Sequence, residues 1–375
     1  MTLTEILNKF KLNGKIVKIE PCGNGRINKT FKVTTHNVNN DTDYKYILQR
    51  INTDLFTKPK ELMKNIENVT SFIEKNKSKS SKMQVIKIIK NNNGANYIET
   101  PDGCFRVYEY IENSVSHDSC IGNPRLFEDC GRIFGEFQSI LDKFDASNLY
   151  ETIPNFHNTK LRYETFLKAI ASADAKRLKD AKTYIVELRH YGETLGLASK
   201  IVDKLENHTL PLRVTHNDTK LNNVAFDRNT DEAIAVLDLD TIMPGAICYD
   251  YGDALRSGCN TENEESIDFK NINFNKELFE SFTSGYLKSA SNFLTKEEVD
   301  SLIDGAMVIT FELSLRFLTD FLQNDIYFGA KQYDSNLNRA INQLSLLNKM
   351  KENEDYMKNF VSSEYKKYSL ETQNL

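Results

Sequence analysis

The sequence predicts an α+β fold with two lobes, a small β-rich lobe followed by a larger, mainly helical lobe. The first part of the chain alternates apolar and polar residues over short runs, as strands do. From residue 124 onward, apolar residues recur at helical spacing. Short apolar runs that carry acidic residues interrupt the helices between residues 212 and 240. Because 375 residues suffice for two such units, we expect lobes at residues 1–112 and 113–375.

The N-terminal lobe is expected to open with a short amphipathic helix in MTLTEILNKFKL and to continue mainly as strands. The expected strands are KIVKIE, TFKVTTH, YKYILQRI, MQVIKIIK, NYIET and FRVYEYIE. One helix is expected at residues 59–76, because Pro59 stands near its start and an apolar stripe follows. Asn93-Gly94 predicts a hairpin between the fourth and fifth strands.

The C-terminal lobe is expected to consist of helices around a few short strands. The predicted helical segments are 124–144, 159–208 and 275–353, with two or three strands at residues 212–240. The last ~20 residues are polar and are expected to fray. This order, strands first and helices second, is typical of the protein-kinase-like fold.

Composition excludes several classes of function. The net charge of −5 and the lack of a long basic stripe argue against nucleic acid as a partner. No apolar run approaches the ~20 residues that span a bilayer, so we expect no membrane partner. The six cysteines form neither a CxxC pair nor a metal-binding spacing, which favours free thiols in a reducing cytoplasm.

The stretch VTHNDTKLNNVAFD carries the strongest chemical signal. Its His216-x-Asp218-x₄-Asn223 spacing is that of a loop that transfers phosphate from ATP. Asp218 would face the acceptor hydroxyl, and the amide oxygen of Asn223 would reach Mg²⁺. His216 is expected to brace the loop through hydrogen bonds.

A second acidic residue, Asp238, follows the apolar run IAVL. A carboxylate at the end of such a strand is a suitable Mg²⁺ ligand. The run LDLDTIM also resembles the opening of the haloacid dehalogenase phosphatases, in which Asp238 would be a nucleophile and Asp240 the second acid. That alternative leaves HNDTKLNN unexplained.

The N-terminal lobe offers candidates for holding ATP. Glycines in GNGRINKTF allow backbone amides to approach a phosphate, and a kinase-like lobe pairs a cation on its third strand with a helix carboxylate. We expect that pair to be Arg50 with Glu67, with Gln49 and Glu61 as the alternatives, and we expect YEYIE to read adenine. The candidate nucleotide-binding residues are Gly23, Gly25, Asn28, Thr30, Arg50, Glu67, Glu109 and Tyr110.

The segment AMVITFELSLRFLTDFL predicts a buried helix that contains Arg316 and Asp320 at i, i+4 spacing. A charge in such a helix needs a partner. Arg316 could face a substrate, or the two residues could form an internal ion pair that only stabilises the helix. We favour a functional role for Arg316 and a structural one for Asp320.

Several segments together resemble the N-acetylhexosamine 1-kinases, within the aminoglycoside phosphotransferase and choline kinase superfamily. They are GNGRINKTF, YILQRIN, FRVYEYIE, HNDTKLNNVAFD, LDLDTIMPGAICYDYGDALR and ELSLRFLTDFLQNDIYF, in the order of that family over residues ~20 to 330. Lys29 and Phe105 depart from it, since the family pattern has Asp and Trp there.

The resemblance implies that ATP and Mg²⁺ are used to phosphorylate the anomeric hydroxyl of N-acetylglucosamine or N-acetylgalactosamine. It implies that Asp218 is the base and contacts the acceptor, that Asn223 and Asp238 bind the metal, and that Arg316 and Tyr327 contact the sugar. The alternative within the same fold is a kinase of another small alcohol, such as an aminoglycoside or a choline-like compound.

Overall fold

The structure is a computed structural model that describes residues 1–23 and 27–373, and its chain forms two compact units. The first unit comprises residues 1–116, 148–154 and 224–243, and the second comprises residues 117–147, 155–223 and 244–375. The α+β architecture, with a strand-rich N-terminal part and a helical C-terminal part, confirms the predicted fold class. The helices within the described ranges are all too short or too polar to cross a membrane.

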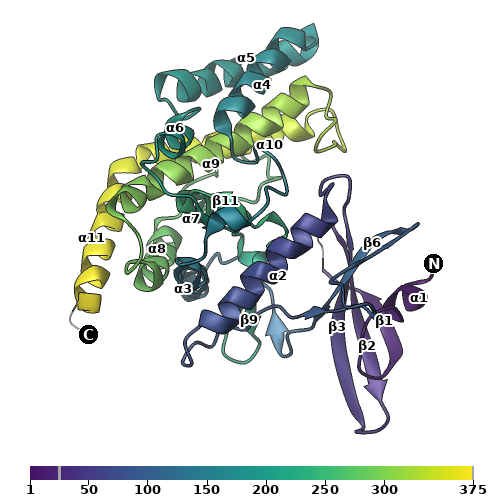
Figure 1. Cartoon of the computed structure of the whole chain (residues 1–375). Coiled ribbons are helices and arrows are strands. Elements are labelled where there is room, and N and C mark those ends of the chain that lie inside the picture. The colour runs from purple at the N-terminus through teal and green to yellow at the C-terminus, as the bar shows by residue number, and fades with distance from the viewer. Residues whose placement is uncertain (24–26, 374–375) are drawn as a thin grey trace. The chain divides into compact units, whose positions relative to one another are not determined.

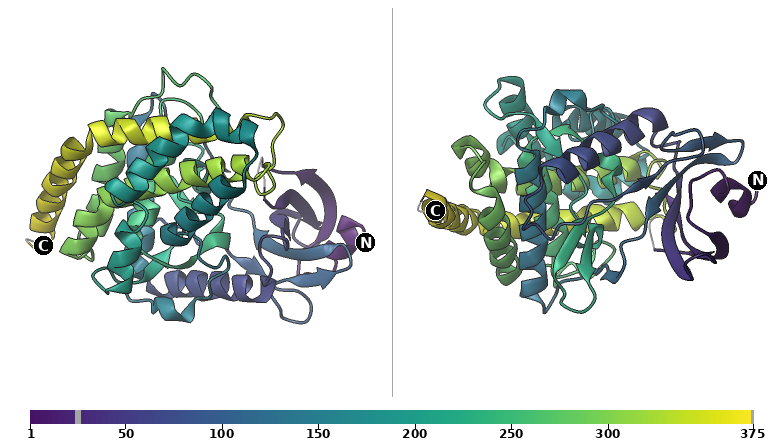
Figure 2. Two further views of the ribbon diagram at one scale, coloured as in Figure 1. Left: turned by 90° about the horizontal axis from the view of Figure 1, so that it is seen from above. Right: turned by 60° about the horizontal axis from the view of Figure 1, so that its bottom comes forward.

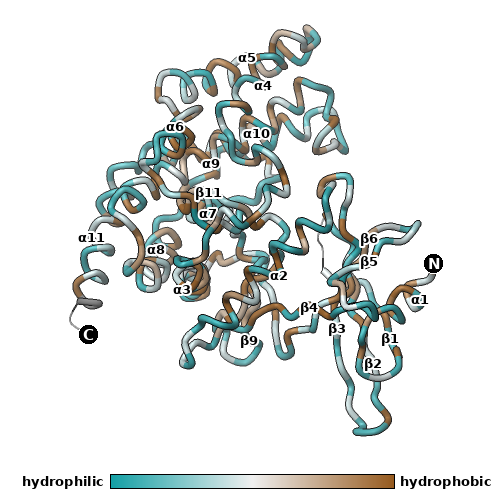
Figure 3. Tube along the Cα trace, viewed as in Figure 1, coloured by the Kyte–Doolittle hydropathy of each residue, from teal (hydrophilic) through white to brown (hydrophobic). Residues whose placement is uncertain are grey.

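The first unit is built on an antiparallel sheet with strand order β1-β2-β3-β6-β4, with β5 also paired to β6 (Figure 1). These strands are β1 (Lys15–Pro21), β2 (Lys29–Asn37), β3 (Thr42–Ile51), β4 (Ile88–Ile89), β5 (Ile98–Thr100) and β6 (Gly103–Glu109). Helix α1 (Leu3–Leu7), the expected short N-terminal helix, is capped by Thr2 and packs on one face through Ile6 and Leu7. Figure 3 colours the chain by hydropathy, with hydrophobic residues in brown along α1 and the strands of this sheet.

Helix α2 (Pro59–Asn76) has the predicted bounds, with proline in its first turn and the apolar stripe buried. The predicted hairpin at Asn93-Gly94 is only partly right. The turn exists, since Gly94 adopts φ +86° and the Asn91 N–H donates to the Ala95 carbonyl. However, β4 and β5 each pair with β6 and not with each other.

The segment 224–243 belongs to the first unit because β7 (Ser114–Val115), β9 (Val224–Asp227) and β10 (Ala233–Val236) form one small sheet. The Gln84 N–H also donates to the Ile234 carbonyl at 2.7 Å. The β7–β9 pairing and this hydrogen bond join residues more than 100 positions apart. The unit is therefore discontinuous, whereas the sequence suggested continuous lobes at 1–112 and 113–375.

The second unit is a bundle in which α3 packs on α8, while α4, α7 and α10 surround the long helix α9 (Figure 2). Its helices are α3 (Pro124–Leu141), α4 (Thr159–Ser172), α5 (Ala175–Arg189), α6 (Lys200–Glu206), α7 (Ile247–Gly258), α8 (Lys276–Ala290), α9 (Lys296–Leu322), α10 (Ser335–Glu352) and α11 (Glu354–Gln373). Strand β8 (Arg213–Thr215) pairs with β11 (Met243–Gly245).

Helices α7 and α9 approach closely at Gly252 and Gly305, where an added Cβ on Gly305 would lie 2.3 Å from the Cys248 carbonyl oxygen. The polar C-terminal segment that was expected to fray forms α11 as far as Gln373 and buries Met357 and Val361, while residues 374–375 lie outside the described residues. Five of the six cysteines are buried and all are free, as predicted.

Candidate active site

The loop that follows β8 is anchored by a buried carboxylate, Asp250 of α7. Its side chain accepts hydrogen bonds from the backbone N–H groups of His216 (2.8 Å) and Asn217 (2.7 Å) and from the Gln138 amide (2.8 Å). The Thr219 hydroxyl donates to the Asp250 carbonyl at 2.5 Å. Burial raises the pKa of Asp250 overall, although these donors oppose it. Asp250 was not predicted from the sequence, although an acidic residue within so apolar a helix is a usable signal.

His216 and Asn217 give the loop its shape. The His216 ring is buried against Phe134 and Phe137, with ring centroids 5.8 and 6.3 Å away, and its Nδ1 accepts from the Asp218 N–H at 3.2 Å. His216 thus braces the loop, as expected from the sequence. Asn217 has φ +63°, a left-handed conformation that Asn tolerates better than most residues. The chain therefore turns sharply just before Asp218.

The structure brings the predicted residues Asp218 and Asn223 into contact and adds Lys220. The Asn223 amide nitrogen donates to the carbonyl (2.8 Å) and to the carboxylate (2.9 Å) of Asp218, which leaves the amide oxygen to ligate a cation. Lys220 Nζ lies 2.7 Å from the other carboxylate oxygen. Burial raises the pKa of Asp218, but Lys220, His216 and Asn223 outweigh burial and lower it overall. The half-buried carboxylate is therefore ionised and held in one orientation.

Near Lys220 lies a buried ion-pair network that was not predicted from the sequence either. Asp253 accepts two hydrogen bonds from Arg256, at 2.9 and 2.8 Å, and Arg256 also pairs with Glu264. Burial lowers the pKa of Lys220, but Asp218 and Asp253 raise it overall. Lys220 therefore stays charged next to Asp218.

In the first unit, Asp238 follows β10 and has an exposed side chain. Its backbone is left-handed, with φ 55° and ψ 62°. Such strained conformations cost of the order of 1–3 kcal/mol and gather at functional sites. An exposed carboxylate on a strained turn is a suitable hard ligand for Mg²⁺.

Asp240, two residues later, is buried and paired in the protein interior. Its carboxylate lies 2.5 Å from Arg106 of β6, and both side chains are almost fully buried. The Asn28 amide donates to the same carboxylate at 2.7 Å and accepts from the Asn52 N–H at 2.9 Å. Asn28, predicted to contact the nucleotide, thus has both amide atoms engaged by the protein.

The predicted ion pair between Arg50 and Glu67 is wrong. Arg50 is exposed, whereas Glu67 pairs with Lys90 at 2.9 Å, which is the first cause of its lowered pKa. The physical reason is strand alternation, because Gln49 and not Arg50 lies opposite Arg106 in the β3–β6 register. The buried cation of this sheet therefore comes from β6.

Gln49 links Arg106 to another predicted residue. The Arg106 Nε–H donates to the side-chain amide oxygen of Gln49 at 3.0 Å. The side-chain amide nitrogen of Gln49 donates to the Thr30 hydroxyl at 3.1 Å. Gly23 adopts φ +76° with open space at its Cβ position, as a phosphate loop requires. Gly25 lies outside the described residues.

The two predicted adenine-reading residues lie at the end of β6. Glu109 is 3.5 Å from Lys87. Tyr110 lines a cavity of about 380 Å³ within the first unit. The other lining residues are Lys32, Lys45, Glu112, Asn113, Ser114 and Arg228. Lys32 Nζ sits 4.5 Å from the Tyr110 ring centroid, so the cavity combines cations with an aromatic face.

The predicted acceptor residues, Arg316 and Tyr327, are neighbours in the second unit. Arg316 donates to the Tyr327 hydroxyl at 3.4 Å and pairs with Glu312 at 3.6 Å. The alternative of an internal Arg316–Asp320 pair is wrong. Asp320 instead accepts from the N–H groups of Tyr327 (2.7 Å) and Phe328 (2.9 Å), which fixes the loop after α9.

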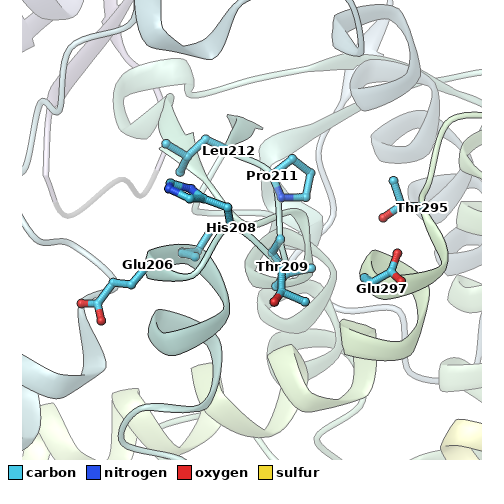
Figure 4. Close-up of a pocket in the computed structure, with 9 residues that line it drawn as sticks. Glu206, His208, Thr209, Pro211, Leu212, Thr295 and Glu297 are labelled. Carbon is cyan, nitrogen blue, oxygen red and sulfur yellow. The ribbon is translucent and has the colours of Figure 1, made fainter.

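A cavity of about 690 Å³ in the second unit contains none of these motif residues (Figure 4). Its lining residues are Leu205, Glu206, His208, Thr209, Leu210, Pro211, Leu212, Thr295 and Glu297. No group of three or more His, Cys, Asp or Glu side chains arranged for a metal was found within the described ranges. A Mg²⁺ site of one or two carboxylates completed by substrate phosphates needs no such group.

The chain is similar in fold to several solved phosphotransferases. It superposes on an aminoglycoside phosphotransferase from Alicyclobacillus acidocaldarius with a TM-score of 0.57 and 12% identity, covering 98% of this chain and 97% of that one. A choline kinase from Cryptosporidium parvum gives 0.56 and 14%, covering 94% and 96%. A spectinomycin phosphotransferase solved with ADP and spectinomycin gives 0.55 and 12%, covering 93% and 96%.

Sequence comparison identifies the family. Residues 18–273, which include Asp218, Asn223 and Asp238, match the profile of the phosphotransferase enzyme family. The match covers more than half of the chain. Because it is to a phosphotransferase family and not to the haloacid dehalogenase phosphatases, it rejects the phosphatase alternative. The chain therefore belongs to the phosphotransferase enzyme family.

Proposed function

We propose that this protein transfers phosphate from ATP to the anomeric hydroxyl of an N-acetylhexosamine, giving the sugar 1-phosphate. The observation that carries the proposal is the fixed, ionised carboxylate of Asp218, held by Asn223 and Lys220 in a loop anchored on Asp250. A carboxylate so placed can accept the proton of an acceptor hydroxyl. Membership of the phosphotransferase family and the ADP in one similar structure support ATP as the donor.

In this proposal Asn223 and Asp238 hold Mg²⁺ through an amide and a carboxylate oxygen. Bound Mg²⁺ would neutralise the charge of the triphosphate. Lys220 would remain charged and keep the Asp218 carboxylate oriented. The proposed nucleotide contacts that remain are Gly23, Thr30, Glu109 and Tyr110.

The surroundings of Arg316 favour a neutral sugar over an aminoglycoside. Sites for polycationic acceptors need several carboxylates. Here two guanidinium groups, Arg316 and Arg162, are close enough to interact around a single carboxylate, Glu312. Such a site suits hydroxyl and carbonyl oxygens. A kinase of another small alcohol, of the aminoglycoside or choline type, is the alternative.

An acceptor panel tests the proposal. Purified protein with ATP and Mg²⁺ is offered N-acetylglucosamine, N-acetylgalactosamine, glucose, galactose, choline, ethanolamine and kanamycin, while ADP and phosphorylated product are measured. We expect stoichiometric ADP and sugar 1-phosphate from an N-acetylhexosamine. Preferred turnover of choline or kanamycin would reject the sugar assignment.

Replacing Asp238 with Asn should remove the charge that binds Mg²⁺. We expect kcat to fall by at least ~10²-fold at saturating ATP, with an increased Mg²⁺ requirement, because a neutral amide is a poorer ligand. Mg²⁺ titration of the initial rate measures this. Asp231→Asn, on the exposed turn before β10, is the matched control and should leave the titration unchanged.

Replacing Arg316 with Lys should raise the acceptor KM by ~10-fold or more and leave the ATP KM unchanged. An ammonium cannot reproduce the planar, multi-donor guanidinium that lies beside Tyr327. Steady-state kinetics with each substrate varied in turn measure this. A lower melting temperature with an unaltered acceptor KM would make Arg316 a structural residue.

A further inference from the structure

A buried carboxylate on α9, Glu312, is held from two sides. Both of its oxygens accept from His157 Nδ1, at 3.2 and 3.1 Å, and one lies 3.6 Å from Arg316 Nη1. The Glu312 side chain is only 2% exposed. Burial raises the pKa of Glu312, but His157, Arg316 and Arg162 outweigh burial and lower it overall. Glu312 is therefore a buried anion that the surrounding cations keep ionised.

His157 is itself fixed in place. Its ring lies 4.9 Å from the Tyr249 ring and 4.4 Å from the Phe156 ring, centroid to centroid. The Tyr249 hydroxyl donates to the His157 carbonyl at 3.4 Å. Because α7 carries Tyr249 and α9 carries Glu312, the packed α7–α9 pair sets the position of His157 relative to Glu312.

The guanidinium of Arg316 is enclosed by aromatic rings but poorly satisfied in hydrogen bonds. Its carbon lies 5.4 Å from the Phe156 ring centroid, 5.8 Å from that of Tyr327 and 5.5 Å from that of Phe328. A guanidinium has five N–H donors. Among the described residues, those of Arg316 make one hydrogen bond, the long one to the Tyr327 hydroxyl. Donors remain for a ligand with oxygen acceptors.

A second guanidinium, Arg162 of α4, adds to the positive charge. It donates to the Phe156 carbonyl at 3.2 Å, and its Nε is buried without a hydrogen-bond partner among the described residues. Burial and then Arg316 lower the pKa of Arg162. Two cations thus share one carboxylate, and a buried unpaired donor is costly until an acceptor arrives.

We infer that Glu312, locked by His157, is a positioning residue that aims the Arg316 guanidinium at the carbonyl or hydroxyl oxygens of the acceptor. The inference rests on the proposed function, because it assigns Arg316 to acceptor binding. Without the fixed anion, the Arg316 side chain would populate several rotamers. Restricting it to one rotamer on binding would cost side-chain entropy and so lower the affinity for the acceptor. Glu312 itself need not touch the acceptor.

The central experiment compares Glu312→Gln with a matched control, Glu298→Gln. Glu298 lies on the same helix, is equally buried, and pairs with Arg213 at 2.8 and 3.0 Å, away from Arg316. We expect Glu312→Gln to raise the acceptor KM by ~10-fold, with kcat and the ATP KM changed less than ~3-fold. Glu298→Gln should lower the melting temperature and leave the acceptor KM unchanged.

Two variants of His157 test whether its hydrogen bond to Glu312 supports acceptor binding. His157→Ala removes the hydrogen bond to Glu312 and should raise the acceptor KM several-fold. His157→Asn can place an amide donor near the position of Nδ1 and should restore most of the acceptor affinity. Equal KM values for the Ala and Asn variants would overturn the role of His157.

Two readouts separate this inference from the proposed function. Kinetics use whichever compound of the acceptor panel the wild type phosphorylates best, so a non-sugar acceptor would reject the sugar but still test Glu312. The side-chain ¹H–¹⁵Nε resonance of Arg316, identified by its loss in Arg316→Lys, needs no acceptor. It should be sharp in the wild type and broadened in Glu312→Gln. An unchanged resonance, or an unchanged acceptor KM, would overturn the inference.

Discussion

Replacing Asp218 with Asn should lower kcat by ~10²–10⁴-fold while changing the dissociation constant of ATP less than ~3-fold, as general-base contributions commonly do. Asn keeps the size of the side chain, so Asn223 and the Asp250 anchor should still hold the loop. What is lost is the basic oxygen that would accept the proton of the acceptor hydroxyl. Steady-state turnover and calorimetric titration with an ATP analogue measure the two effects separately.

A control for this substitution is Asp203→Asn. Asp203 is a half-exposed carboxylate that also pairs with a lysine, Lys160, at 2.7 Å. Its removal should leave kcat within ~2-fold of the wild type, since an exposed ion pair of this kind contributes little. If the Asp218 variant turned over as fast as the Asp203 variant, Asp218 would not be the base.

Local sequence signals were sufficient for elements that are determined by their own residues. Helix α2 matches its prediction because proline in its first turn and the buried stripe from Leu62 to Ile73 act within 18 residues. The contact between Asp218 and Asn223 was predictable for the same reason, since a separation of five residues fixes their proximity in a tight loop. In both cases the interacting groups are close in sequence.

The errors concern contacts that distant residues create. Arg50 was expected to be the cation of the sheet, and only the β3–β6 register turns Gln49 and not Arg50 toward Arg106. The C-terminal segment was expected to fray because its composition is polar. Contacts with α8 and α9 instead order the part up to Gln373 as α11. Neither the orientation of Arg50 nor the packing of the C-terminal segment can be predicted from a short stretch of sequence alone.

Buried charge is the signal that could have been used more fully. Asp250, Arg106 and Glu312 each interrupt an apolar run in the sequence, and each proves to be a buried ion or anchor. Their partners could not be predicted, because His157 and Glu312 are 155 residues apart and Arg106 and Asp240 are 134 apart. A lone charge in an apolar run therefore predicts that a partner exists without identifying it.

The buried pair of Arg106 and Asp240 should have the largest effect on stability. Both side chains are at most 4% exposed, so Asp240→Asn leaves a guanidinium without its counter-ion in the interior of the first unit. Loss of one partner of such a pair typically costs ~3–5 kcal/mol. We expect a decrease of that size in the free energy of unfolding of the first unit, measured by urea denaturation. As a control, Glu232→Gln removes an exposed pair with Lys82 in the same unit and should cost less than ~1 kcal/mol.

A double variant distinguishes two contributions to stability: the destabilisation caused by an unpaired buried charge, and the net stabilisation that the intact ion pair provides. Arg106→Met combined with Asp240→Leu removes both charges and fills the space with apolar atoms. Replacement of a buried pair in this way is often neutral or stabilising. The double variant should therefore recover most of the stability that Asp240→Asn loses, although Asn28 and Gln49 would each lose a hydrogen-bond partner. If the double variant were as unstable as the single one, the hydrogen bonds of Asn28 and Gln49, and not charge compensation, would be what stabilises the turn that carries Asp238.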